Sequence, residues 1–273
     1  MSVLLTLTSL LLYLFAAGFY GTRLLLTDAQ EKSLSVPRWL VRVGIVVQFF
    51  AIGAYCITVK RSPFAGMFGT LSFAGWSIAV AFAVFELRLR VGVAGAIALL
   101  CASMFLFRAL LFSGEVASTD TVLRNPLITL HVAAILISFG LFVIAFAASL
   151  LYLWQDRELK RKRVRTAFRR LPSLQTLDKA AWSAVAVALP LMTIGLALGM
   201  VRVFGTGLAH TPAQWFLDPH TIMSFLAWGV YIFYIGARLG AGWYGNRLQY
   251  ILIIGMALVL SLTFAPSLPH RFV

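Results

Sequence analysis

Long apolar segments follow one another along this chain, separated by short polar connections. Each is about 20 residues long, the length that an α-helix needs to cross the hydrocarbon core of a bilayer. The segments lack the two-residue alternation of a barrel strand, and a helix satisfies its own backbone in lipid. The pattern predicts an all-α integral membrane protein with about eight transmembrane helices, at 3–22, 39–59, 66–86, 91–113, 127–154, 178–204, 219–239 and 248–268.

The composition supports a membrane protein. The chain is 61% hydrophobic and 12% charged, whereas a soluble domain is about half apolar and about a quarter charged. The net charge is +14, but the basic residues lie in short loops, where they set topology and contact anionic lipid. We therefore expect a lipid bilayer as partner and no nucleic acid. We also expect one polytopic domain over 1–273, with four spans in 1–113 and four more in 127–273.

The basic residues also predict the orientation of the spans. The stretch 155–170 is the most basic and should be cytoplasmic. Alternation of the spans then places Arg38, Arg88 and Arg247 on the same side, and both termini on the extracytoplasmic side.

Four histidines fall near the predicted outer face. His131 lies about one turn into the fifth span, His210 and His220 lie in the connection to the seventh span, and His270 follows the last span. A polar side chain at this depth needs a partner, and neutral imidazole is a common ligand of metals and of haem iron. A hydrogen bond to a neighbouring helix explains His131 equally well. A frayed terminus near the interface is the alternative for His270.

A Trp–Asp–Pro segment lies in the same outer region. Asp218 and Pro219 suit a helix start, with Asp at the N-cap and Pro at the first helical position. Trp215 and Trp228 suit either an aromatic belt at the interface or a shelf that stacks on a flat apolar ligand. The two interpretations are compatible.

Further polar and conformationally special residues lie near the same face. Arg108 and Arg202 either extend to the interface or bind carboxylates, such as haem propionates, with both nitrogens. Pro190 is expected to kink the sixth span, and Gly195 and Gly199 permit close helix packing. A kink below the outer loop predicts either a cavity there or ordinary packing.

In their order along the chain, these elements resemble the cytochrome c assembly protein family. That family includes the CcsA/ResC-like haem proteins and a shorter HemX-like and YpjD-like branch. The shared elements are a histidine that opens a span, a basic cytoplasmic loop, a span containing proline, a Trp-rich outer loop and a final histidine. Here they are His131, 155–170, Leu189 to Gly195, Trp215 to Trp228, and His270. The resemblance covers about half of the chain.

The resemblance implies a haem-binding protein of a bacterial-type cytoplasmic membrane. The haem would be b-type and non-covalently bound at the outer face. His131 and His270 would ligate its iron, and the segment with Trp215, Asp218 and Trp228 would face it. His210 and His220 stay open as alternatives for the second ligand.

The outer segment has fewer aromatic and charged residues than the family pattern. Leu217 precedes Asp218, and His220 and Thr221 follow Pro219, where the family has an aromatic residue and a lysine-glutamate pair. We therefore expect an accessory protein that binds, hands over or senses haem, rather than a cytochrome c synthase. It would support cytochrome c assembly or regulate haem synthesis, with proteins of those processes as partners.

Two rival functions lack a haem cofactor. A small-molecule transporter would need acidic residues deep in a span, whereas Glu86 and Asp178 lie at the ends of predicted spans. A membrane scaffold would instead use the basic 155–170 stretch to recruit an acidic soluble partner.

Overall fold

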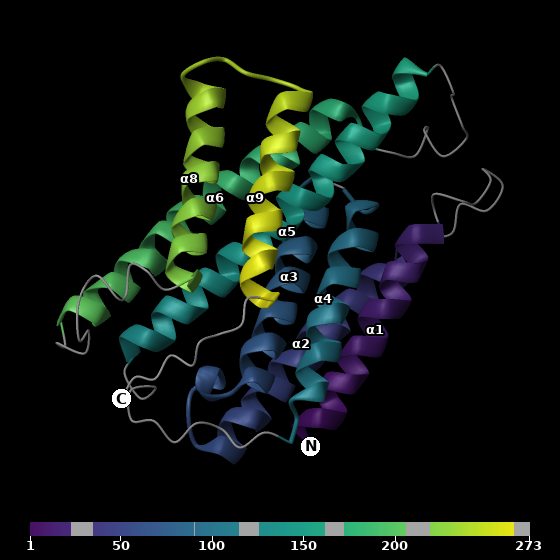
Figure 1. The fold of residues 1–273 in the computed structure, drawn as a ribbon. Coiled ribbons are helices and arrows are strands. Elements are labelled where there is room, and N and C mark those ends of the chain that lie inside the picture. The colour runs from purple at the N-terminus through teal and green to yellow at the C-terminus, as the bar shows by residue number, and fades with distance from the viewer. Residues whose placement is uncertain (23–34, 90, 115–125, 162–171, 206–218, 265–273) are drawn as a thin grey trace.

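The computed structural model describes residues 1–22, 35–89, 91–114, 126–161, 172–205 and 219–264. Within these residues the chain forms α-helices and one 3₁₀ turn, and no strand (Figure 1). In chain order the elements are α1 (Ser2–Thr22), α2 (Ser35–Val59), η2 (Pro63–Ala65), α3 (Met67–Leu89), α4 (Ala94–Leu111), α5 (Pro126–Lys160), α6 (Leu174–Gly205), α8 (Pro219–Leu239) and α9 (Asn246–Phe264).

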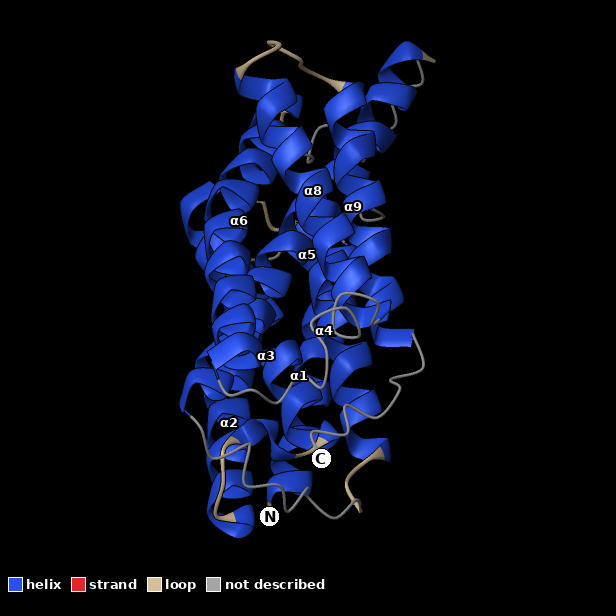
Figure 2. Cartoon of the chain, turned by 60° about the vertical axis from the view of Figure 1, so that its left-hand side comes forward, coloured by secondary structure: helices blue, strands red, loops and turns tan. Residues whose placement is uncertain are grey.

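The helices form an elongated bundle with their axes running broadly along its length (Figure 2). Seven of them, α1 to α6 and α8, are long and apolar enough to cross a membrane, and α9 is a shorter apolar helix in its described part. The prediction of an all-α, multi-pass membrane protein is confirmed. The eight predicted spans correspond one to one with the eight helices. The orientation of the bundle and its division at residue 113 stay predictions.

Several helix ends differ from the predicted spans by a few residues, and at two of them side-chain contacts explain the difference. Helix α5 continues to Lys160, so the predicted basic loop begins six residues later than expected. At 35 residues, α5 is about 52 Å long and therefore extends beyond a hydrocarbon core of about 30 Å. Lys160 binds Asp156 one turn earlier, at 2.7 Å, which supports the added turn. Helix α6 begins at Leu174 because Ser173 caps it, accepting a hydrogen bond from the Thr176 amide at 3.2 Å.

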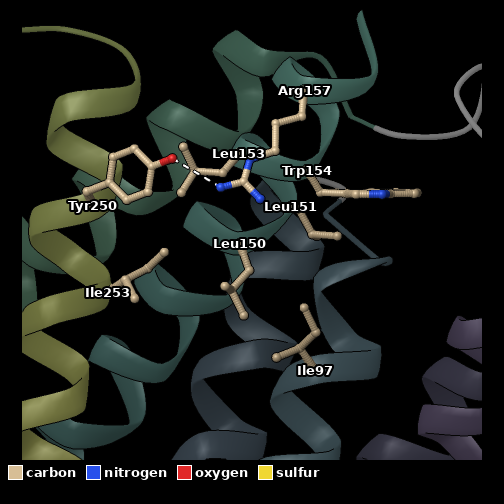
Figure 3. A pocket seen from close by; sticks show the side chains of 8 residues that line it. All are labelled: Ile97, Leu150, Leu151, Leu153, Trp154, Arg157, Tyr250 and Ile253. Carbon is tan, nitrogen blue, oxygen red and sulfur yellow. Dashed lines mark hydrogen bonds between the residues drawn. The ribbon is translucent and has the colours of Figure 1, made fainter. Parts of the chain in front are cut away.

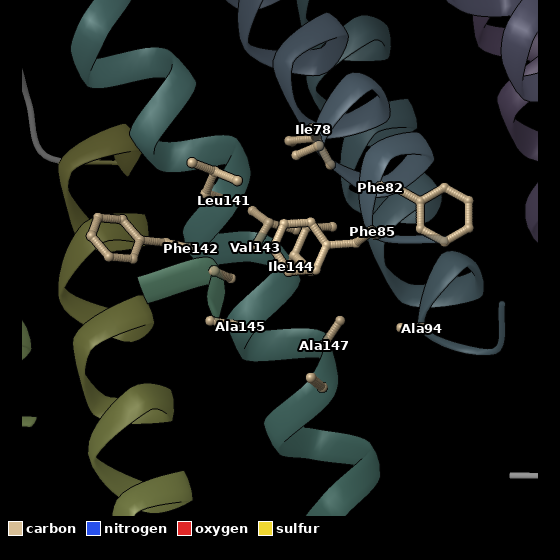
Figure 4. Packing of buried hydrophobic residues seen from close by; sticks show 14 of the residues in the cluster. Ile78, Phe82, Phe85, Ala94, Leu141, Phe142, Val143, Ile144, Ala145 and Ala147 are labelled. Atoms are coloured by element: carbon tan, nitrogen blue, oxygen red, sulfur yellow. The ribbon is translucent and has the colours of Figure 1, made fainter. Parts of the chain in front are cut away.

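Helix α5 is the central element of the bundle, and it packs against α3, α4, α6 and α9. Figure 4 shows its apolar side chains, including Leu141 and Ile144, beside Ile78 and Phe85 of α3. At Gly140 a Cβ atom would lie 2.7 Å from the carbonyl oxygen of Ser77. A side chain there would therefore force α3 and α5 apart, so this contact fixes the spacing of the two helices.

A buried carboxylate joins the first three helices. Glu86 of α3 is 4% exposed. Its Oε1 accepts hydrogen bonds from the Tyr20 hydroxyl of α1 at 2.6 Å and from Nε of Arg38 of α2 at 3.1 Å. We call these residues the Glu86 tie.

A second carboxylate joins four other helices. Arg238 of α8 donates hydrogen bonds from both terminal nitrogens to the Asp178 carboxylate of α6, at 2.6 and 3.0 Å. Gln249 of α9 donates to the same carboxylate at 3.0 Å and accepts from Ser149 of α5 at 2.8 Å. The Arg238 guanidinium also stacks over Trp182 at 4.9 Å. We call this group the Asp178 tie. Both carboxylates lie at helix ends and are paired, which gives the transporter interpretation no support.

Candidate functional site

A cavity of about 390 Å³ opens between the helices of the bundle, near the end of α4 and the beginning of α5. Ligand sites in proteins typically occupy about 300–1,000 Å³. Its walls come from α3, α4, α5, α6, α8 and α9 and are mostly apolar, with Met67 and Met192 among them. The polar residues that line it are Thr70, Arg108, His131, Ser138 and Ser224. A pocket of this kind suits a large apolar ligand with a few polar attachment points.

His131 lies in the second turn of α5 and is half-buried. Its Nδ1 lies 2.6 Å from the carbonyl oxygen of Gly195 in α6. A carbonyl oxygen can only accept, so Nδ1 must carry the proton. In the neutral ring, Nε2 then keeps its lone pair and is able to bind a metal. Such a bond from the other ring nitrogen is the usual way in which a metal-binding histidine is oriented.

Two glycines of α6 make room for this imidazole. A Cβ atom at Gly199 would lie 2.9 Å from Cε1 and 3.1 Å from Nδ1 of His131. One at Gly195 would lie 2.7 Å from Cδ1 of Ile135. The predicted close packing at these glycines is therefore confirmed. Pro190 lies inside the same helix, and a cavity is present beside the following turns, at Met192 and Leu196.

Arg108 reaches the same cavity from the last turn of α4. It is half-buried, and its guanidinium lies 6.0 Å from the ring of Phe112. Phe105 and Phe139 pack together in the wall with their ring centroids 5.0 Å apart. The cavity thus offers a cation and aromatic surface within reach of His131, a combination suited to a flat ligand with acidic groups.

Trp228 joins α8 to α6 beside this cavity. Its Nε1 donates to the Thr193 hydroxyl at 2.9 Å, and Thr193 donates to the Leu189 carbonyl at 2.8 Å. Ser224, one turn earlier on α8, lines the cavity itself. Trp228 therefore positions α8 against the helix that seats His131.

The remaining predicted residues lie beyond what the structure describes. Arg202 lies in α6 and His220 in α8, but only their backbone is described. His210, Trp215, Asp218 and His270 fall outside the described residues. Pro219 is the first residue of α8, as predicted. In the part of the chain that is described, no three His, Cys, Asp or Glu side chains gather as a metal cluster.

Sequence reasoning missed the contribution of α3 and α4 to this cavity. Only Arg108 was a candidate there, yet Met67, Thr70 and Leu71 of α3 form one wall. It also missed the Gly195 carbonyl as the partner of His131. The four-residue spacing of Gly195 and Gly199 was the available signal, but the rotation of α6 relative to α5 is not readable from it.

Comparisons with known proteins show that the similarity to the family begins earlier in the chain than His131. The model of the cytochrome C assembly protein family matches residues 64–269, which includes α3 and α4 as well as the chain from His131 to residue 269. The chain is 25% identical over 236 residues to Protein HemX of Brevibacillus brevis, covering 84% of this chain and 83% of that protein. It is 23% identical over 273 residues to the Cytochrome c biogenesis protein CcsA of Prochlorococcus marinus (strain MIT 9303), covering 84% of each. It is 24% identical over 240 residues to Protein HemX of Bacillus subtilis (strain 168), covering 85% of this chain and 82% of that protein.

Proposed function

Because the chain belongs to the cytochrome c assembly protein family, we propose that it holds haem in the His131 cavity. From there it hands the haem over, or reports its presence, in support of cytochrome c assembly or of the regulation of haem synthesis. The relatives named for cytochrome c biogenesis and the HemX relatives cover more than four fifths of this chain. Both roles are therefore consistent with the resemblance.

The observation that carries this proposal is the hydrogen bond between Nδ1 of His131 and the Gly195 carbonyl, at 2.6 Å. It fixes the proton on Nδ1, so Nε2 is the nitrogen that would bind iron. Arg108 would bind a propionate, and the aromatic wall at Phe105 and Phe139 would pack on the macrocycle. Bound haem supplies an iron that takes axial nitrogen ligands. The haem would be b-type, since we propose no covalent attachment.

His270 is the proposed second axial ligand, with His210 and His220 as alternatives. Trp215 and Asp218 are proposed to cover the haem from the outer side. Two imidazoles would occupy both axial positions and leave no open position for oxygen chemistry, so we propose an accessory role rather than a cytochrome c synthase. We propose that the basic residues after α5 face the cytoplasm, which would put the His131 end at the outer face of a bacterial-type cytoplasmic membrane.

The test is an absorption spectrum. The purified protein in detergent is titrated with ferric haem, and the wild type is expected to give a low-spin, six-coordinate spectrum. His131→Ala should abolish that spectrum, and added imidazole should restore it, because the truncated side chain leaves room for the free ligand. Thr193→Val is the matched control, since it breaks the bond from Trp228 on α6, the helix that also carries Gly195, and leaves the His131 side chain unchanged.

An unchanged spectrum in His131→Ala would overturn the ligand assignment. The second ligand is identified by comparing three variants: His270→Ala, His210→Ala and His220→Ala. We expect only His270→Ala to convert the spectrum to a high-spin form. Conversion by His210→Ala or His220→Ala instead would reassign the second ligand and leave the role of His131 intact.

A further inference from the structure

A second hollow lies at the opposite end of α5. It is an open groove of about 530 Å³ between α4, α5 and α9. Its floor is aliphatic, formed by Ile97, Leu150, Leu151, Leu153 and Ile253, and its polar end carries Trp154, Arg157 and Tyr250 (Figure 3). The groove therefore has an apolar body and one cationic, aromatic end.

The Arg157 guanidinium is held at the end of this groove. Its Nη2 donates to the Tyr250 hydroxyl at 3.2 Å, and Figure 3 shows it between Tyr250 and Trp154, above Leu150. The bond to Tyr250 uses only one of the five N–H donors of the guanidinium. Trp154 is 38% exposed and Tyr250 is 45% exposed, so a ligand can reach the group from the membrane.

The neighbouring acidic groups do not neutralise Arg157. Asp156 is bound to Lys160 at 2.7 Å and to the Asn246 amide at 2.6 Å. Glu158 follows in sequence, and among the residues that the structure describes no carboxylate lies within ion-pair distance of Arg157. Lys160 and Arg161 follow on the same helix end, so the local charge is positive. The groove end thus has a cation available for an anion.

We propose that this groove binds an anionic phospholipid, with one acyl chain on the aliphatic floor and the phosphate on Arg157. The Tyr250 hydroxyl is a second donor for the phosphate. The apolar body favours a lipid over a soluble phosphate, because a phosphate alone would leave the aliphatic floor uncovered. The site is distinct from the His131 cavity and does not depend on haem binding.

One Lys or Arg at a membrane surface favours an anionic lipid by about five-fold over a zwitterionic one. We therefore expect about five-fold enrichment of phosphatidylglycerol over phosphatidylcholine at the groove. Arg157→Gln should remove that enrichment. Arg42→Gln is the matched control, because Arg42 is an exposed arginine of α2, a helix that does not line the groove.

Trp154 provides a local reporter. The protein is placed in phosphatidylcholine vesicles that contain a small fraction of either brominated phosphatidylglycerol or brominated phosphatidylcholine. Bromine on the acyl chain quenches nearby indole fluorescence, and subtraction of the Trp154→Phe signal isolates Trp154. The brominated anionic lipid should quench Trp154 at about one fifth of the mole fraction that the zwitterionic lipid requires, in wild type and Arg42→Gln but not in Arg157→Gln.

Equal quenching by the two lipids, or enrichment that survives in Arg157→Gln, would overturn the proposal. Relief of the quenching by millimolar inorganic phosphate would also overturn it, since the site would then recognise phosphate without a chain. A second measurement does not depend on Trp154. In native mass spectrometry with equal amounts of both lipids, the ratio of bound phosphatidylglycerol to phosphatidylcholine should fall about five-fold from wild type to Arg157→Gln.

Discussion

The Glu86 tie and the Asp178 tie lie at the same end of the bundle, but they join their helices with different numbers of bonds. Glu86 receives one bond each from Tyr20 and Arg38 on a single oxygen. Asp178 receives three bonds on both oxygens, and its arginine also stacks on Trp182. The second tie includes α5 and α6, the two helices whose contact seats His131. The four helices of the Asp178 tie, all of which line the His131 cavity, are therefore joined by more bonds than the first three helices.

Removing Asp178 should give the largest loss of stability. Asp178→Ala leaves Arg238, which is 13% exposed, without its counter-charge, so we expect the free energy of unfolding to fall by about 3 kcal/mol. Denaturation in mixed detergent micelles, followed by circular dichroism, measures the change. Lys160→Ala is the control, because this lysine is 69% exposed and its pair should contribute under about 0.5 kcal/mol. A loss below about 1 kcal/mol in Asp178→Ala would show that the tie is not structural.

Gly199→Ala tests whether the frame around His131 matters for binding. The added Cβ would press on Cε1 of His131 from 2.9 Å and disturb its bond to Gly195. Loss of such an orienting contact typically weakens metal binding about 10–100-fold, and we expect a loss of haem affinity in that range, read by absorption titration. Gly229→Ala is the matched control, since no atom lies within 4 Å of its new Cβ. Equal affinities in the two variants would contradict the seating role of Gly199.

Glu86→Gln should give a smaller and more local loss. The charge-assisted bonds from Arg38 and Tyr20 weaken, and we expect about 1.5 kcal/mol less stability. Faster hydrogen exchange should be confined to α1, α2 and the end of α3, with haem affinity within about two-fold of wild type. If haem affinity fell as far as in Gly199→Ala, the two ties would not be separable and the comparison would fail.

Trp228→Phe should have the smallest effect. It removes one hydrogen bond, from Nε1 to the Thr193 hydroxyl, worth about 1 kcal/mol. Combining it with Thr193→Val in a double-mutant cycle should recover most of that energy as coupling. Additive losses would mean that the two side chains do not act as a pair.

Much of the fold was predictable because a bilayer sets both the length and the polarity of each span. Every predicted span has its helix, and the errors fall at the ends. Helix α5 extends beyond its apolar stretch because Gln, Arg and Lys, the types of Gln155, Arg157 and Lys160, have high helix propensity in water. Helix α6 starts early because Ser173 caps it. Hydropathy carries no information about either feature.

The candidate site was less predictable than the fold. The sequence singled out His131 and Arg108, and the structure brings both to one cavity. It did not reveal that the Gly195 carbonyl accepts the hydrogen bond of His131, because the rotation of one apolar helix against another depends on packing. Nor did it reveal Met67 or Thr70, since their wall forms only when α3 packs beside α5.

The bond between His131 and Gly195 also bears on the leakage of protons across the bilayer. A histidine carries protons across a barrier by taking one on one ring nitrogen and releasing one from the other. Here the Gly195 carbonyl oxygen accepts a hydrogen bond from Nδ1, but an amide carbonyl is too weak a base to take the proton, so proton exchange is restricted to Nε2. The imidazole therefore cannot relay a proton from one ring nitrogen to the other. A polar residue can then lie in this membrane cavity without giving the proton gradient a route to dissipate.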